Sequence, residues 1–445
     1  MGASLHFGQF GGIDRRLYSV IVLAFGIVYC LRRVKKRQAL GQKWTDMRPG
    51  WWPFQKDIDY QQLCIVHATE KHELVADSVW EWVASSARHG KVQPVADLGQ
   101  GTGQARPPQF LLDAYKDAST IHESHHYGPT NGLPQFLETL SNVYSPLYGR
   151  ILDSQKEISV HSGGTEAILC AITAFVGPGD EVIVLEPAFD LYELHTKFVG
   201  GVLRSVPLHP PSNAATHVTK ADDWLLDIDE LERVVNPKTK IFVLNTPHNP
   251  LGKIFSVQEL VSIGNLSVKY GFIIVSDEVY EHLHYTKTFA RIATLDARFA
   301  RNTVTVGSIG KSFNVTGWRV GYAIGDHELI KHIQAIHIIL SFTTAGPAQL
   351  AAASALELAE EHGFWSSYRE ETRRKIKSLC EIFQELGLPY VEPSGAHYVL
   401  LNAGKIRVPG DYLFPEKVIS KSRDWKLCWF LLQEFGVATI PVSGE

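Results

Sequence analysis

The residues best suited to chemistry gather in one stretch, SIGKSFNVTGWRVG, at positions 308–321. Lys311 lies just past an apolar, β-branched run and is flanked by small residues. Partial removal from water lowers the pKa of a lysine amine, and only the neutral amine can attack an aldehyde. Ser308 and Arg319 can hold a phosphate, the arginine through two parallel N–H groups. The stretch therefore predicts an imine-forming lysine beside a phosphate site, and a surface lysine on a loop is the simpler alternative.

A second candidate phosphate site lies at a turn between a strand and a helix. The segment SGGTEA (162–167) joins the run ISVHS to the apolar stretch AILCAITAFV. Backbone N–H groups at a helix N-terminus attract anions, so those of Gly164 and Thr165 are candidates to meet a phosphate. Many such turns bind nothing, so this motif alone does not define a site.

Three other motifs resemble known sites but lack the context that those sites need. The segment 310–312 ends like a P-loop, but Thr305 stands where its first glycine belongs. Two prolines (107–108) follow the GQGTG turn (99–103), where a dinucleotide site would continue into a helix. The segment HESHH (122–126) is a literal HExxH, but no apolar stripe precedes it, so we expect a polar loop and no zinc site.

The elements that must position these residues alternate between short apolar runs and helix-like stretches from about residue 158 to 325. The runs are VIVLEP (182–187), IFVLNTP (241–247), FIIVSDE (272–278), TVTVGS (303–308) and VGYAIG (320–325). Such β-branched runs are typical of strands buried on both faces, and their alternation with helices predicts a mostly parallel sheet sandwiched by helices. Ligands of such sheets bind beyond the carboxyl ends of the strands. Polar residues stand there: Glu186, Asn245, Asp277 and Ser308.

The pattern changes after about residue 326, which indicates a second, smaller α+β domain. Long helical stretches (326–340 and 347–387) lead to a strand-like run, HYVLLN (397–402), and residues 78–98 are expected to pack with them. The predicted parts are an N-terminal extension (1–50), an arm with part of the small domain (51–97), a large domain (98–330) and a small domain (331–445).

Composition excludes some classes of protein. The chain has 445 residues, 45% of them hydrophobic, and a net charge of −4, so it can bury a large core but has no basic surplus for nucleic acid. Its five cysteines are scattered without a CxxC pair, which disfavours a disulfide framework and favours a reducing compartment.

The N-terminus carries an uncharged, mostly apolar segment (17–31) with basic residues on both sides. It is shorter than the roughly 17–25 residues that usually span a membrane. A short membrane anchor, a cleaved targeting sequence and an extension irrelevant to the fold all remain open. We therefore expect a cytoplasmic or mitochondrial protein, with anchoring through residues 17–31 as the alternative.

From about residue 78 to its last residue, the sequence resembles the class I and II aminotransferases, which are pyridoxal-phosphate (PLP) enzymes of fold type I. The stretch around Lys311 is similar to the lysine signature of that family. Other motifs are closest to the group of kynurenine aminotransferases, glutamine transaminases and cysteine-conjugate β-lyases. These motifs are DLGQG (97–101), EPAFDLY (186–192), LNTPHNPLGK (244–253) and SDEVYEHL (276–283). The resemblance implies a large PLP-binding domain with a mixed sheet and a smaller α+β domain.

The resemblance also implies roles around the cofactor ring. Lys311 would form the imine and later move the proton between substrate and cofactor. Asp277 would keep the ring nitrogen protonated, so that the ring accepts electrons. Tyr280 and Asn249 would hydrogen-bond the ring's phenolic oxygen, and Asn245 would lie near ring and substrate.

Further residues are implied at the edges of the site. Gly164, Thr165, Ser308 and Arg319 would hold the phosphate, and Phe189 would stack on the ring. Gly101 would approach the substrate through its backbone, as Asn249 would with its side chain. Tyr127 would reach the phosphate of a neighbouring subunit, which implies a homodimer with shared sites.

The implied activity is transfer of an amino group from kynurenine, glutamine, or another aromatic or sulfur-containing amino acid to a 2-oxo acid, with β-elimination from cysteine conjugates as a side reaction. Residues 102–106 depart from the family, which leaves the preferred substrate open. The family also places an arginine for the substrate carboxylate some 20 residues after GVATIPVS (436–443), beyond Glu445. We therefore expect an incomplete small domain, and a PLP-binding protein with little activity is the alternative.

Overall fold

A computed structural model describes residues 79–443, apart from residues 89, 94, 104 and 286–288. These residues fall within one compact unit, Glu70–Glu445, so the domain boundary expected near residue 330 stays a prediction. The apolar segment 17–31 lies outside the described residues. Among the described helices, none is long and apolar enough to cross a membrane.

A mixed sheet of eight strands forms the centre of the fold, in the order β2-β10-β9-β8-β7-β3-β4-β6. Strands β4, β3, β7, β8 and β9 are parallel, and β10 runs antiparallel to both of its neighbours, as β6 does to β4. The bounds are β2 Ile158–His161, β3 Glu181–Glu186, β4 Val202–His209, β6 Leu225–Leu226, β7 Thr239–Asn245, β8 Ile273–Asp277, β9 Thr303–Ser308 and β10 Gly321–Gly325. The mostly parallel sheet predicted from the apolar runs is confirmed.

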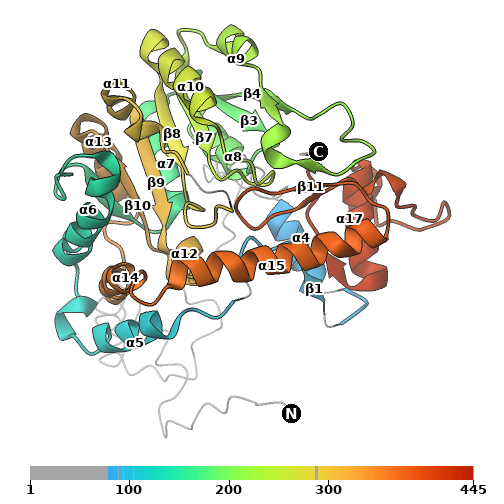
Figure 1. Cartoon of the computed structure of the whole chain (residues 1–445), viewed down its shortest axis with the longest axis horizontal. Helices are drawn as coiled ribbons and strands as arrows, with labels where there is room; N and C mark the ends of the chain where they lie inside the picture. The colour runs from blue at the N-terminus through green and yellow to red at the C-terminus, as the bar shows by residue number, and fades with distance from the viewer. Residues whose placement is uncertain (1–78, 89, 94, 104, 286–288, 444–445) are drawn as a thin grey trace, which may run out of the picture. The chain divides into compact units, whose positions relative to one another are not determined.

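Helices cover both faces of this sheet (Figure 1). On one face, α7 (Gly164–Phe175) and α13 (His327–Leu340) share a buried cluster with the central strands, and α8 (Leu191–Phe198) contributes Tyr192 to it. On the other face the helices are α9 (Ile228–Val234), α10 (Val257–Tyr270) and α11 (Ala297–Arg301).

The two ends of α10 show why its sequence forms a helix between these residues. Ser256 accepts a hydrogen bond from the N–H of Glu259, whose carboxylate accepts from the N–H of Ser256 in return. This reciprocal pair satisfies two N–H groups that the first turn leaves unpaired. Gly271 ends the helix in the left-handed conformation with φ 79°, where a glycine carries no steric penalty.

A third buried cluster surrounds the edge of the sheet formed by β2 and β10. It joins α5 (Gln109–Ala118), α6 (Pro134–Tyr148), α14 (Gly346–Leu358) and the short α12 (Ile309–Ser312). Short 3-10 segments complete the connections: η2 His122–His125, η3 Ala221–Asp223, η4 Ile292–Thr294, η5 Thr316–Trp318 and η6 Ala403–Lys405.

The C-terminal part brings together segments that lie far apart in the sequence. In Figure 1 the long α15 (Phe364–Glu385) crosses the view below the sheet, and α17 (Arg423–Phe435) lies beside α4 (Val79–Arg88). Strand β1 (Ala96–Asp97) pairs in parallel with β13 (Val437–Ala438). The remaining elements are β5 Thr219–Lys220, β11 Tyr390–Glu392, β12 Leu400–Leu401 and α16 Glu416–Ile419.

Two expected elements differ in extent. The stretch 347–387 forms two helices, because Gly363 adopts the left-handed conformation with φ 58° between α14 and α15. In the run HYVLLN (397–402), only Leu400–Leu401 pairs as a strand, with β11. His397 and Tyr398 are left outside the ladder.

Candidate active site

Lys311 lies in α12, directly after the carboxyl end of β9. Its amine donates a hydrogen bond to the backbone carbonyl of Gly101 and lies 5.6 Å from the centre of the Tyr280 ring. The turn that carries it is tight, since a Cβ at Gly310 would come within 2.9 Å of the Cα of Thr316. The sequence therefore fixes the lysine at the end of a buried strand, as expected.

The surroundings of Lys311 favour its neutral form. The pKa of the Lys311 amine is lowered to about 8, chiefly by burial and also by the charge of Arg319, while the carboxylate of Asp277 acts in the opposite direction. About a tenth of such amines are neutral at pH 7, whereas fewer than about one in a thousand ordinary lysines, with a pKa of about 10.4, are neutral. The residue can therefore act as a nucleophile and as a base.

Asp277 ends β8 and is buried. Its carboxylate accepts a hydrogen bond of 2.5 Å from the hydroxyl of Tyr192 and one of 3.3 Å from the N–H of Val279. Burial raises the pKa of Asp277 above its usual value, and these hydrogen bonds and the charge of Lys311 limit that rise. The structure thus brings a carboxylate and a lysine amine together inside the protein.

The neighbouring strand β7 supplies two asparagines beside Asp277. Asn245 stands opposite Asp277 in the parallel register, and its amide donates to the Asp277 carbonyl at 3.0 Å. The side-chain oxygen of Asn245 accepts the backbone N–H of Asn249 at 2.6 Å. Asn249, which is buried, is thereby held over the carboxyl ends of both strands.

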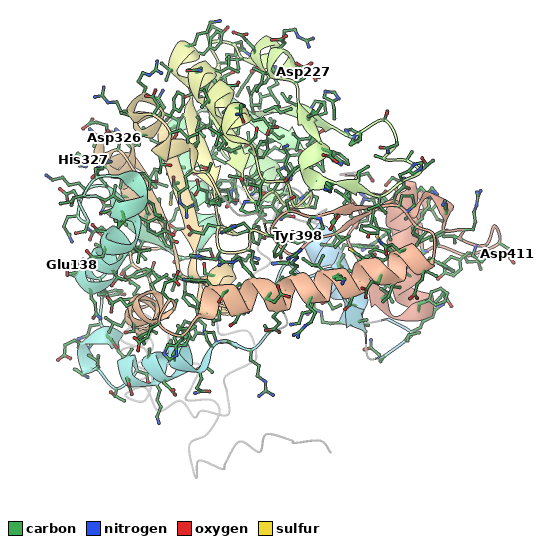
Figure 2. The ribbon with its side chains drawn as sticks, viewed as in Figure 1. Glu138, Asp227, Asp326, His327, Tyr398 and Asp411 are labelled. Atoms are coloured by element: carbon green, nitrogen blue, oxygen red, sulfur yellow. The ribbon has the colours of Figure 1, made fainter. Side chains whose placement is uncertain are left out.

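Tyrosines surround the lysine. The hydroxyl of Tyr280 lies 2.6 Å from that of Tyr398, and Figure 2 shows Tyr398 between the sheet and α15. The hydroxyl of Tyr368 lies 3.1 Å from both the Lys311 carbonyl oxygen and Oδ1 of Asn314, and it can donate its one hydrogen to either. These contacts tie the lysine-bearing turn to α15.

The turn before α7 forms a cradle against Arg319. Gly163 has φ 93°, and a Cβ there would lie 2.3–2.9 Å from the Arg319 guanidinium, so only glycine fits. That guanidinium donates to the carbonyls of Ser162 and Thr316, each at 3.1 Å. Helix α7 starts at Gly164, and its first N–H groups, including that of Thr165, have no acceptor within the helix. Ser308, the last residue of β9, is buried nearby in the ladder opposite Gly321.

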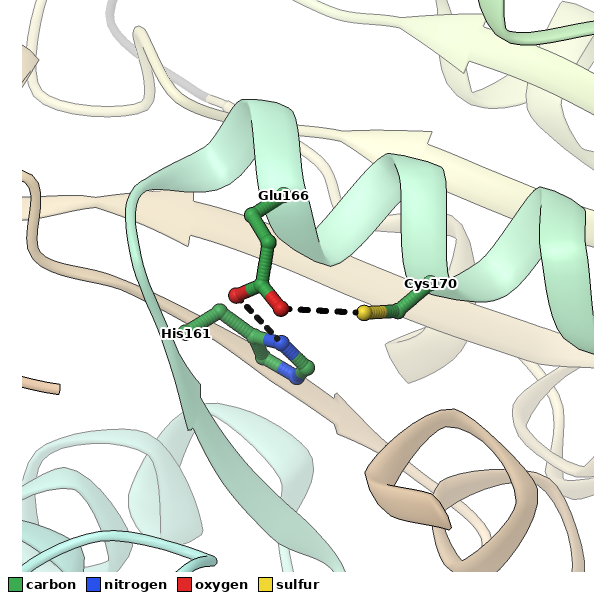
Figure 3. A group of neighbouring side chains, drawn as sticks. All are labelled: His161, Glu166 and Cys170. Carbon is green, nitrogen blue, oxygen red and sulfur yellow. Dashed lines mark hydrogen bonds and ion pairs between the residues drawn. The ribbon is translucent and has the colours of Figure 1, made fainter. Parts of the chain in front are cut away.

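A carboxylate and two hydrogen-bonded histidine rings brace this turn from behind. Figure 3 shows Glu166 in contact with Nδ1 of His161 at 3.2 Å and with the Cys170 thiol at 3.2 Å. Glu166 also accepts the N–H of Ser162 at 2.7 Å and contacts Nδ1 of His337 at 2.8 Å. Burial raises the pKa of Glu166, but the hydrogen bonds from both histidines outweigh it and hold the pKa well below its usual value. The distances of 2.7–3.2 Å are those of hydrogen bonds.

The HExxH segment is not carried on an α-helix. Residues His122–His125 form a short 3-10 helix, and His126, the second histidine of the motif, follows it in an extended conformation. Within the described part of the chain, the only group of side chains close enough to share a metal ion is His161, Glu166 and Cys170.

A cavity of about 1620 Å³ opens beside the lysine. Its wall includes Phe189, Tyr192, Asn249 and Tyr398. Lys311 itself is not part of this wall, because its amine is turned onto Gly101. Asp277 is also set back, one hydrogen bond behind Tyr192.

The two aromatic residues predicted at the edges lie in different surroundings. The ring of Phe189 packs edge-on against that of Tyr192, with 5.6 Å between their centres. Tyr127 is 84% exposed and packs against Phe342, away from the cavity wall. The structure therefore brings Phe189 into the site but leaves Tyr127 on the surface of the single chain.

Sequence reasoning missed four residues: Tyr192, Tyr368, His397 and Tyr398. The motif EPAFDLY already contained Tyr192, three positions after Phe189, so its spacing on one side of a helical turn could have indicated it. The other three come from α15 and the segment after β11, more than 50 residues from Lys311. No local pattern links them to it.

Comparisons with known proteins agree with this geometry. The profile of the family described as Aminotransferase class I and II matches residues 94–444. A relative from Saccharomyces cerevisiae, named probable kynurenine–oxoglutarate transaminase BNA3, is 38% identical over 373 residues, covering 82% of this chain and 84% of the relative. The kynurenine–oxoglutarate transaminase of Dictyostelium discoideum is 34% identical over 357 residues, covering 78% and 82%. The crystal structure of Bna3p, a putative kynurenine aminotransferase from Saccharomyces cerevisiae, superposes with a TM-score of 0.79 at 37% identity, covering 82% and 87%.

Proposed function

Because the chain belongs to the class I and II aminotransferases, we propose that its amino donor is kynurenine and that its acceptor is 2-oxoglutarate. The chain is a PLP-dependent transferase that moves an amino group between an amino acid and a 2-oxo acid. The names of its relatives support kynurenine, and a wide cavity with aromatic residues in its wall, Phe189 and Trp425 among them, can accept an aryl side chain. The alternative of a cofactor-binding protein with little activity is not favoured.

The residues present fit PLP in three respects. The glycine turn before α7 and the Arg319 guanidinium leave N–H donors for a phosphate. Asp277 supplies a buried carboxylate for a protonated ring nitrogen, and Lys311 supplies an amine with a lowered pKa. When bound, PLP supplies an aldehyde carbon and a ring that accepts electrons from the substrate's Cα.

The single observation that carries this proposal is the convergence of Lys311 and Asp277. With PLP and substrate bound, the Lys311 amine would take the proton from the substrate's Cα and deliver it to the carbon that was the cofactor's aldehyde. A pKa of about 8 suits both directions of this transfer near neutral pH. Asp277, held as a carboxylate by Tyr192, would face the protonated ring nitrogen.

Other side chains orient the groups that react. In this proposal Tyr280 and Asn249 hydrogen-bond the ring's phenolic oxygen; the hydrogen bond from the Asn249 N–H to Asn245, which fixes Asn249, supports this role. Phe189 stacks on the ring, a role supported by its position after β3 and in the cavity wall. Gly101 borders the substrate, which the contact of its carbonyl with the Lys311 amine supports.

We further propose that the enzyme works as a homodimer in which Tyr127 reaches the phosphate site of the partner. Tyr127 is far more exposed than a tyrosine in a cofactor site would be, and Phe342, which packs against it, is exposed too. Ile339 and Leu340, at the end of α13 just before Phe342, are also exposed. Exposed apolar residues gathered in one place are typical of a surface covered by another chain.

The test is spectroscopic and catalytic. Purified protein loaded with PLP should show the visible band of the lysine-bound cofactor, and Lys311→Ala should abolish it, whereas Lys116→Ala on the exposed face of α5 should not. L-kynurenine should bleach the band, and 2-oxoglutarate should restore it with release of glutamate. If other amino acids bleach the band and kynurenine does not, the substrate proposal is wrong.

A further inference from the structure

His397 presents an unpaired hydrogen-bonding ring to the cavity. It lines the cavity wall, and both ring nitrogens are buried without a hydrogen-bond partner. Its ring packs edge-on against Tyr280, with 5.3 Å between centres, and lies 4.5 Å from the ring of Tyr398.

An imidazole always carries at least one N–H, so this arrangement leaves a donor without an acceptor. Burial, together with the charge of Lys311, lowers the pKa of His397 to about 3, so the ring is neutral with one donor and one acceptor nitrogen. Buried polar groups in native proteins nearly always have a partner. A ligand in the cavity is the natural acceptor.

Five other histidines of the described residues each leave one ring nitrogen buried without a partner, but none of them lies in the cavity wall: His161, His195, His248, His282 and His337. His161 and His337 use Nδ1 on Glu166, and His282 stacks on Trp365 with 3.6 Å between ring centres. His397 alone among these six combines two unpaired nitrogens with a place in that wall.

The position of His397 indicates which ligand it meets. The Tyr280 ring lies against both groups: its centre is 5.3 Å from that of the His397 ring and 5.6 Å from the Lys311 amine. A substrate whose amino group is held at Lys311 must therefore extend past this tyrosine into the cavity. Resting on the proposed transaminase function, we propose that His397 donates its ring N–H to a carboxylate or carbonyl oxygen of the bound amino acid or 2-oxo acid.

The main experiment replaces the His397 ring with a ring that has no hydrogen-bond donor. In the PLP-loaded protein, His397→Phe should raise the KM for amino acids and the dissociation constant measured by calorimetry about tenfold, the effect of one lost hydrogen bond. The visible band and kcat should change less than twofold. His397→Gln, which keeps an N–H, should recover at least half of the lost affinity on a logarithmic scale.

Two further variants control for packing. His195→Phe replaces another largely buried histidine, outside the cavity wall, and should leave affinity unchanged. His397→Leu removes the donor with a smaller side chain and serves if His397→Phe fails to bind PLP. Equal affinity of the wild type, His397→Phe and His397→Leu for every substrate would overturn the proposal.

The choice of substrate locates the acceptor oxygen. A loss of affinity shared by phenylalanine, kynurenine and glutamine assigns the α-carboxylate, whereas a loss confined to kynurenine and glutamine assigns the side-chain carbonyl. If the wild type binds amino acids through His397 but converts none, the proposed function fails and this inference stands. If the wild type converts amino acids and substitution of His397 has no effect on their affinity, the proposed function stands and this inference fails.

Discussion

Tyr192 and Asp277 form the contact on which the chemistry of the site depends at the scale of single residues. A carboxylate at the end of a buried strand tends to take up a proton, because burial penalises its charge. The Tyr192 hydroxyl and the Val279 N–H counter this by donating to it. These two hydrogen bonds thus keep the Asp277 carboxylate charged, which is the form that a protonated ring nitrogen requires.

Removing the Tyr192 hydroxyl should therefore lower the catalytic efficiency of the enzyme while PLP stays bound. In Tyr192→Phe we expect kcat/KM to fall roughly tenfold, because a hydrogen bond to a charged group contributes about 1.5–3 kcal/mol. Tyr148→Phe, which removes a hydroxyl bonded to Thr305 away from the cavity, is the control. Equal kcat/KM in both variants would exclude this role for Tyr192.

The lowered pKa of Lys311 predicts how cofactor attachment depends on pH. Only the neutral amine reacts, so the rate at which apoprotein acquires the visible band should rise with pH and level off above a midpoint of about 8. Asp277 raises the pKa of Lys311, so Asp277→Asn should shift the midpoint downward. A rate that keeps rising to the midpoint of free lysine, about 10.4, would contradict the prediction.

At the scale of elements, the turn before α7 is held by a side chain that does not itself face the phosphate. Glu166 gathers the Ser162 N–H and two histidine rings behind the turn. Fixing this backbone keeps the first N–H groups of α7 directed outward, where an anion binds.

Glu166→Gln should loosen this turn, because its amide N–H₂ would face groups that also donate. We expect the dissociation constant of PLP, measured by fluorescence titration of apoprotein, to rise about tenfold. The exposed Glu138 of α6, at the periphery in Figure 2, gives the control variant Glu138→Gln. An unchanged dissociation constant in Glu166→Gln would show that the turn holds its shape without this carboxylate.

Sequence alone was sufficient for the elements whose signal is local. Lys311, Asp277 and Asn245 could be placed because each ends or follows an apolar run that is long enough to identify as a strand, and parallel strands bring their carboxyl ends together. The break at Gly363 was missed, because helix-forming residues continue on both sides of it. His397 and Tyr398 were missed because only tertiary packing brings their segment to Tyr280.

At the scale of the whole molecule, the exposed Tyr127 and its apolar neighbours predict a homodimer. Sedimentation of the wild type should give a molecular mass twice that of one chain. In Ile339→Asp the measured mass should fall to that of one chain, because burying a charge in the interface opposes association. Ile339 is 78% exposed in the single chain, and Leu413→Asp, at a residue 90% exposed on a loop elsewhere, is the control. A monomeric wild type that retains full activity would exclude shared sites.

The pairing of β1 with β13 has a mechanical consequence. Only a few residues separate β1 from Gly101, whose carbonyl holds the Lys311 amine, while β13 directly follows α17. Two backbone hydrogen bonds, Ala96 to Gly436 and Leu98 to Ala438, clamp these strands together. A displacement of α17 would therefore move β13, then β1, and with it the Gly101 carbonyl oxygen that accepts the hydrogen bond from the Lys311 amine. The position of α17 would thereby affect the position of the reactive amine.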